Sequence, residues 1–172
     1  GIPTTLKSQI NRVLADGDFK AKANATMTLV GTEGGKAMLI GLGKTDKVDV
    51  HAYREAGATV VAACKKVHGS ELTVVFHDAD LASMTSFAEG MMLRDYAYDL
   101  YKQKDEEDED VKLSARINCN EGDTTALSAA IDRAASIVSG VHLSRDLGNC
   151  PPNDMYPMAF AEKAELWAKQ YD

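Results

Sequence analysis

Apolar residues recur every three or four positions in five stretches of the chain, the spacing that gathers them on one face of an α-helix. The pattern predicts a short amphipathic helix over 4–15, which ends at the turn Asp16-Gly17-Asp18. Further helices are predicted over 50–67, over a segment that begins near 84–86 and ends near 96, over a long segment after 123, and over 157–171.

Two of the predicted helices carry signals for their first residue. A capping box of Ser86 with Glu89 would begin the third helix, whereas Met84, Phe87 and Met91 favour a slightly earlier start. The long helix has an expected N-cap and the most regular apolar stripe of the chain. These residues are Asp123 for the cap and Leu127, Ile131, Ala134, Val138 and Val141 for the stripe.

Four shorter runs have the composition of β-strands. Residues 26–30 and 37–40 predict either a hairpin or two adjacent strands, and the continuous apolar run 72–76 predicts a strand buried on both faces. Residues 111–119 alternate apolar and polar side chains, as an edge strand would. The order of strands and helices predicts an α/β fold, a three-layer sandwich in which helices cover both faces of a mixed sheet.

A domain boundary is predicted where regular structure breaks at Asn149-Cys150-Pro151-Pro152-Asn153, because consecutive prolines remove backbone donors and disfavour a helix. Residues 1–148 then form one domain, and 149–172 form a linker and one further helix. That helix gathers Phe160, Ala164, Trp167 and Tyr171 on one face, which nothing later in the sequence covers. We expect this face to dock on another copy or to fray, with packing back onto its own domain as the alternative.

Composition and charge narrow the class of protein. The chain is 45% hydrophobic and has a net charge of -7, and a run of six acidic residues lies at 105–110. We expect this run to be solvated and mobile, since it lacks the spaced ligands of a calcium loop and the basic clusters that bind nucleic acid. The absence of a long apolar stretch predicts no membrane span or signal peptide and a cytoplasmic protein. The widely spaced Cys64, Cys119 and Cys150 are interpreted as reduced thiols.

Motifs that suggest chemistry do not assemble an active site. Gly43-Lys44-Thr45 lacks the earlier glycine of a phosphate-binding loop, because Met38 stands there, and a strand-end turn is the better interpretation. The cluster His77-Asp78-Ala79-Asp80 suggests a metal site, but capping of the following helix explains it as well. His51, His68 and His142 stand alone in sequence and are interpreted as surface or packing residues. We therefore assign no catalytic, cofactor-binding or metal-binding residue.

Three segments together resemble the leucyl aminopeptidase (cytosol aminopeptidase) family. Residues 38–44 (MLIGLGK) are similar to the strand and GLGK turn of its amino-terminal domain. Residues 87–104, which include Ala88-Glu89-Gly90, Tyr96 and Tyr101, resemble that domain's AEG helix and its YxFDxYK ending. Residues 144–157 (SRDLGNCPPNDMYP) resemble the ARDLxNxPPNxLTP segment that leads into the catalytic domain, although Tyr156 replaces the usual threonine.

The resemblance implies a macro-domain-like fold and a non-catalytic role in a metal-dependent aminopeptidase. In the family, two divalent metals, zinc or manganese, are bound by residues that lie downstream of Asp172, so this segment is expected to hold no cofactor and to be inactive alone. The implied partners are its own catalytic domain, a homohexamer and peptide substrates. The family also has a strand before its first helix, so the sheet is expected to be one strand short.

Two other functions follow from the resemblance. A macro-domain-like module could bind ADP-ribose or a nucleotide, but the glycine loops here are too sparse for phosphate binding. DNA binding is known among family members and conflicts with the acidic balance of this chain.

Overall fold

The computed structural model describes residues 2–32, 35–66, 71–102, 113–119 and 124–171 of the 172-residue chain. Helices and strands occur where the hydrophobic pattern predicts them, so the α/β class is confirmed. The order is α1 (Thr4–Ala15), β1 (Thr26–Val30), β2 (Lys36–Ile40), a short 3-10 helix (Thr45–Lys47), α2 (Val50–Lys66), β3 (Glu71–Val75), α3 (Leu81–Asp95), β4 (Ser114–Asn118), α4 (Thr124–Asn149) and α5 (Pro157–Tyr171).

The strands form two small sheets in the described part of the chain. Strands β1 and β2 pair antiparallel with Thr26 opposite Ile40, and Gly31 N donates to Gly35 O at 2.7 Å, so this segment is a hairpin. Strands β3 and β4 pair in parallel, with Glu71 opposite Ser114. A single mixed sheet was expected; the observed sheets are separate because no described strand joins the hairpin to β3.

Strand β3 corrects a second expectation. Its side chains alternate between half-buried and exposed, and Val75 is 46% exposed. The prediction of a strand buried on both faces is therefore wrong. The apolar run conceals a period of two, in which Leu72 and Val74 face the helices while Thr73 and Val75 face away.

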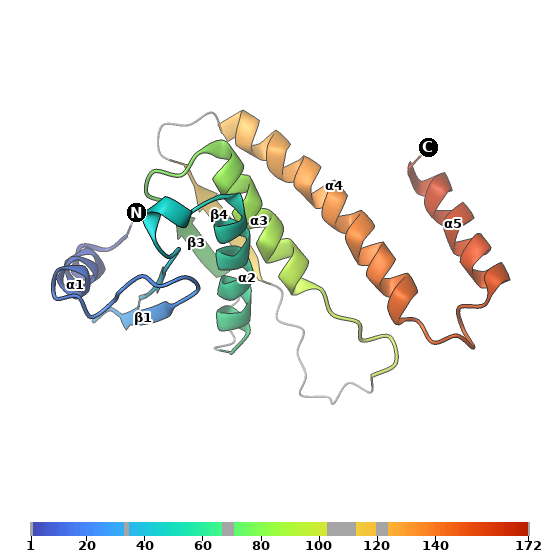
Figure 1. Cartoon of the computed structure of the whole chain (residues 1–172), viewed down its shortest axis with the longest axis horizontal. Helices are drawn as coiled ribbons and strands as arrows, with labels where there is room; N and C mark the ends of the chain where they lie inside the picture. Colours follow the sequence, from blue (N-terminus) through green and yellow to red (C-terminus); the bar gives the residue numbers. More distant parts are fainter. Residues whose placement is uncertain (1, 33–34, 67–70, 103–112, 120–123, 172) are drawn as a thin grey trace.

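The core lies between α2 and α3. Tyr53, Val60 and Val61 of α2 pack with Phe87 and Met91 of α3, and β3 and the end of β2 add partly buried side chains. Aromatic rings reinforce this packing: the ring of Phe76 lies 5.1 Å from that of Phe87 in a perpendicular arrangement. Figure 1 shows α4 extending along the outer side of α3.

Helix α3 begins earlier than the capping box requires. Asp80 is the N-cap, and its side chain accepts a bond from Ser83 N at 2.8 Å. Ser86 lies buried inside the helix, so the capping box with Glu89 is wrong and the earlier start is confirmed. The cause is the local preference of a short carboxylate for free amides at a helix start.

Helix α4 has the predicted stripe, with Leu127, Ala134 and Val138 buried. It ends at Asn149, just before Cys150 and Pro151, because a residue before proline is disfavoured in the helical region. The expected cap Asp123 and the acidic run 105–110 lie outside the described residues. No helix in the described segments is long and apolar enough to span a membrane.

Candidate functional site

The GLGK turn packs closely against the loop that precedes β1. Gly41 lies so close to the preceding loop that a Cβ there would be 2.2 Å from Lys22 O, and Gly43 has a φ of +94°. Backbone bonds from Asn24 N to Gly41 O and from Gly43 N to Ala21 O join the turn to the same loop. Both glycines are therefore needed for close approach and a left-handed turn, and the interpretation as a strand-end turn is confirmed.

The His77–Asp80 cluster also has structural roles. Asp80 caps α3, and this bonding to Ser83 holds the pKa of its carboxyl below the ordinary value. His77 Nε2 lies 3.3 Å from Asp78 Oδ2, and both side chains are almost fully exposed. Among the residues with a described placement, no group of three or more His, Cys, Asp or Glu side chains could hold a metal ion.

The other histidines occupy separate places. His51 is exposed on α2, with its Nδ1 3.3 Å from Arg54 Nη1. The ring of His142 packs 5.1 Å from that of Tyr96, which confirms a packing role, and His68 lies outside the described residues. Cys64, Cys119 and Cys150 are free thiols.

The AEG segment of α3 is where two helices cross at closest approach. A Cβ on Gly90 would lie 1.9 Å from Arg54 O, and one on Gly57 would lie 2.1 Å from Phe87 O. Next to this crossing, Arg54 Nη2 donates to Glu89 Oε2 at 2.9 Å, and both side chains are half-buried. The segment therefore fixes α3 on α2 through backbone contact and one ion pair.

The end of α4 is joined to the chain that follows α3 by a network centred on Tyr96. The Tyr96 hydroxyl donates to Asp146 Oδ1 at 2.8 Å and accepts from Asn149 Nδ2 at 3.0 Å. Partial burial and the bond to Asp146 raise the pKa of this hydroxyl. Arg145 lies over the Tyr96 ring, 5.3 Å from its centroid, and its Nη1 donates to Leu93 O at 3.0 Å. The SRDLGN segment thus secures the end of α3.

The chain just beyond α4 is bound by a second tyrosine. The Tyr101 hydroxyl donates to Asp154 Oδ2 and lies 3.7 Å from Cys150 Sγ. Its ring packs against that of Tyr98, with centroids 6.1 Å apart. The bond to Asp154 raises the pKa of the Tyr101 hydroxyl. Together with the Tyr96 network, these contacts define the candidate site, which we call the junction: residues 96–102 with residues 145–154.

Sequence reasoning found both junction segments through their resemblance to a family but did not predict that they touch. The chemistry of the side chains could have indicated this contact. Tyr96 and Tyr101 lie in a polar stretch, where a hydroxyl needs a hydrogen-bond partner, and Asp146 and Asp154 lie next to the predicted boundary. The pairing itself spans about fifty residues and has no local pattern.

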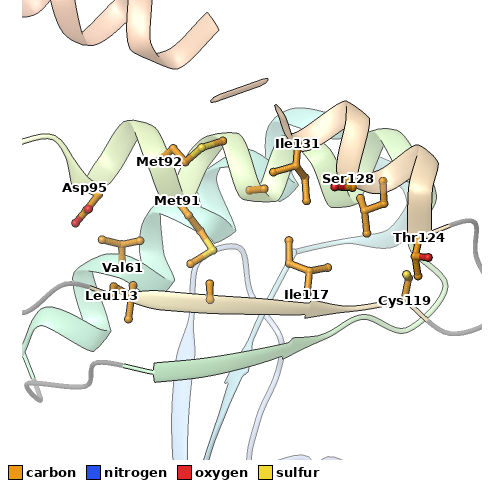
Figure 2. A pocket seen from close by; sticks show the side chains of 13 residues that line it. Val61, Met91, Met92, Asp95, Leu113, Ile117, Cys119, Thr124, Ser128 and Ile131 are labelled. Carbon is orange, nitrogen blue, oxygen red and sulfur yellow. The ribbon is translucent and has the colours of Figure 1, made fainter. Parts of the chain in front are cut away.

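A separate cavity of about 390 Å³ lies between α3, α4 and β4. Figure 2 shows mostly apolar side chains around it, with Asp95 at one end and Thr124 and Cys119 at the other. Among the residues with a described placement, neither a lysine nor an arginine lines it. A nucleotide diphosphate needs convergent donors or cations, so the lining does not favour ADP-ribose.

The comparisons with known proteins identify the family. Residues 2–105 match the model of the cytosol aminopeptidase family, N-terminal domain. A probable cytosol aminopeptidase of Agrobacterium fabrum is 37% identical over 171 residues, which is 91% of this chain and 33% of that protein. One of Rhizobium etli is 34% identical over 156 residues, 86% of this chain and 31% of that protein. The chain thus spans about a third of the length of these relatives.

Solved structures share the fold. A mutant of tomato leucine aminopeptidase superposes with a TM-score of 0.79 at 24% identity, over 96% of this chain and 34% of that one. The bottromycin maturation enzyme BotP superposes with a TM-score of 0.75 at 21% identity, over 99% of this chain and 35% of that one. The chain therefore belongs to the cytosol aminopeptidase family, and residues 2–105 correspond to its amino-terminal domain.

Proposed function

We propose that this chain is the non-catalytic amino-terminal part of a leucyl aminopeptidase, a metal-dependent hydrolase that removes N-terminal residues from peptides. In this proposal residues 1–148 form the scaffold and oligomerisation domain, and residues 149–172 form the linker and first helix of the catalytic domain. The junction is the observation that carries it. The segments most specific to the family are committed to hydrogen bonds within the chain, as expected of a structural connection between domains.

The proposal places the metals elsewhere in the protein. BotP, a structural neighbour, has also been described in complex with Mn, and the proposal expects two divalent ions, zinc or manganese, in the catalytic domain that follows. The described residues of this chain do not fit such a centre, because they offer no cluster of three metal-binding side chains. No catalytic step is therefore assigned to them.

The partners follow from the same assignment. The exposed apolar residues of α5, among them Met158, Phe160 and Leu166, suit coverage by the protein's own catalytic domain. A homohexamer in the cytoplasm, acting on peptides, completes the proposal, and the relatives' name of cytosol aminopeptidase supports the compartment. Nucleic-acid binding and membrane binding are not part of it.

A peptidase assay tests the proposal that this part of the protein is not catalytic. The purified 172-residue chain is expected to show no leucine amide hydrolysis above a mock purification, with or without added manganese or zinc. The full-length relative of Agrobacterium fabrum, purified in the same way, is the positive control. Metal-dependent turnover that follows the 172-residue chain through gel filtration would contradict the proposal.

A thermal shift with ADP-ribose tests the ligand-binding alternative. No stabilisation is expected, because the described residues that line the cavity include no cation. The control is Ala115→Phe, which adds a ring at the exposed cavity lining. A rise in melting temperature that disappears in this variant would favour a ligand-binding module.

A further inference from the structure

Helix α5 is held to the molecule in a different way from the other helices. It has no extensive packing contact with any other element among the residues described, whereas α4 packs along α3. Figure 1 shows that the chain turns back after α4, so that α5 lies on the side of α4 away from α3, at the opposite end of the molecule from α1. Met158, Phe160 and Leu166 are all more than half exposed. Among the interactions described, those of the linker 150–156 are the ones that connect α5 to the rest of the molecule.

The linker is locally stiff. Cys150 N donates to Asp146 O at 3.0 Å, which continues the bonding of α4 by one residue. After two prolines, whose φ angles are restricted, Asp154 N and Met155 N both donate to Pro151 O, at 3.0 and 2.9 Å. A stiff segment of this kind transmits an orientation from one end to the other if it is anchored at both.

Tyr101 supplies that anchor from outside the linker. Its single hydroxyl contacts Cys150 before the prolines and Asp154 after them. The ring is packed against Tyr98, and the turn that carries Tyr101 is closed by Lys102 N to Asp99 O at 3.1 Å and by an ion pair of the same residues at 2.6 Å. These contacts fix Tyr101 within the turn 98–102, and the bonds of Tyr96 to Asp146 and Asn149 join the start of that segment to α4.

We propose that Tyr101 is a positioning residue, whose hydroxyl contacts with Asp154 and Cys150 fix the direction in which α5 leaves the domain. The consequence for a catalytic domain after α5 rests on the proposed function, but the positioning of α5 is a property of this chain. Loss of the hydroxyl leaves the domain and α5 folded and frees the hinge between them.

Time-resolved fluorescence anisotropy of Trp167 measures this directly, because Trp167 is the only tryptophan of the chain and lies on α5. In the unchanged chain, its emission is expected to depolarise mainly with the tumbling of the whole molecule. Tyr101→Phe keeps the ring against Tyr98 but removes the hydroxyl, so a faster nanosecond component should appear at the expense of the slow one. Asp154→Ala should give the same result.

Two variants separate positioning from general damage. Asp154→Asn retains an oxygen that accepts from Tyr101 and should restore the slow decay. Tyr156→Phe removes a hydroxyl from an exposed tyrosine of the same linker and should leave the decay unchanged. Far-ultraviolet circular dichroism of each variant should match that of the unchanged chain.

An unchanged decay in both Tyr101→Phe and Asp154→Ala would overturn the proposal, as would an equal effect of Tyr156→Phe. If Tyr101→Phe lowers the helix content, the anisotropy decay of Asp154→Ala tests the proposal instead, because this variant changes only an exposed loop side chain. The measurement needs no enzymatic activity. Failure of the peptidase assignment would therefore leave its result intact, and failure here would leave that assignment untouched.

Discussion

At the scale of single residues, several glycines and acidic residues of the family-like motifs and of the His77–Asp80 cluster have structural explanations. Gly41 and Gly90 stand where another backbone comes too close for any side chain. Glu89 binds Arg54 on the neighbouring helix, and Asp80 begins α3. These residues position helices and turns, and none of them needs a ligand to explain its place.

Gly90→Ala should destabilise the fold. Its Cβ would meet the backbone carbonyl of Arg54, which cannot rotate away, and overpacking of this kind costs about 1–3 kcal/mol. A urea unfolding curve followed by circular dichroism should show a lower midpoint with an unchanged slope.

The control is Gly140→Ala in α4, where an added Cβ would have nothing within 4 Å. Alanine is the better helix former, so this variant should gain about 0.5–1 kcal/mol. Equal behaviour of the two variants would show that the α2–α3 crossing is looser than described.

At the scale of elements, the docking of α4 on α3 should depend on a few positions of its stripe. Val138 is 3% exposed, whereas its neighbour Ile137 is 55% exposed. Val138→Ala should cost about 1–3 kcal/mol through lost burial and a residual cavity. Ile137→Ala should change stability by less than about 0.5 kcal/mol.

Chemical denaturation of the two single variants under identical conditions measures this difference. They remove aliphatic carbons from adjacent positions of one helix, so differences in helix propensity are small beside the effect of burial. A loss for Ile137→Ala as large as that for Val138→Ala would mean that the other face of α4 is covered in solution.

Helix and strand positions could be predicted because they depend on local periodicity. The apolar stripe of α4 and the first and last residues of α5 can be predicted from residues that are close together in the sequence. The pairing of strands cannot be predicted in this way, because the alternation of side chains along β3 does not indicate that β4 is the strand with which it pairs. The junction was missed for the same reason: Tyr101 and Asp154 meet only after α3 and α4 have packed.

At the scale of the whole molecule, stability should fall on the alkaline side. Tyr96, Tyr98 and Tyr101 all have a pKa above the ordinary value of 10.0. Below that value both folded and unfolded chains hold the phenolic protons, so the contribution of these hydroxyls is complete. Above it the unfolded chain releases protons that the folded chain retains, and stability is lost as pH rises through the folded pKa values.

Urea midpoints measured from about pH 8 to about pH 11 test this. The midpoint should decline once the pH passes the ordinary tyrosine value, and the decline should be shallower in Tyr101→Phe, which has one fewer raised group. Lysine titration in the same range affects both chains alike. An identical decline in both would contradict the assignment of the raised pKa to the junction.

Because α4 is long, a small tilt of this helix produces a large displacement at the junction. Its 26 residues form a rod about 39 Å long, at about 1.5 Å per residue. A tilt of about 5° at the Leu127 end would swing the far end by about 3 Å. Tyr96 and Arg145 make contacts near that far end. A contact there resists a tilt of α4 more effectively than an equal contact near Leu127, because it acts farther from the point about which the helix tilts. Contacts at this end therefore limit how far a small tilt of α4 displaces the linker 150–156.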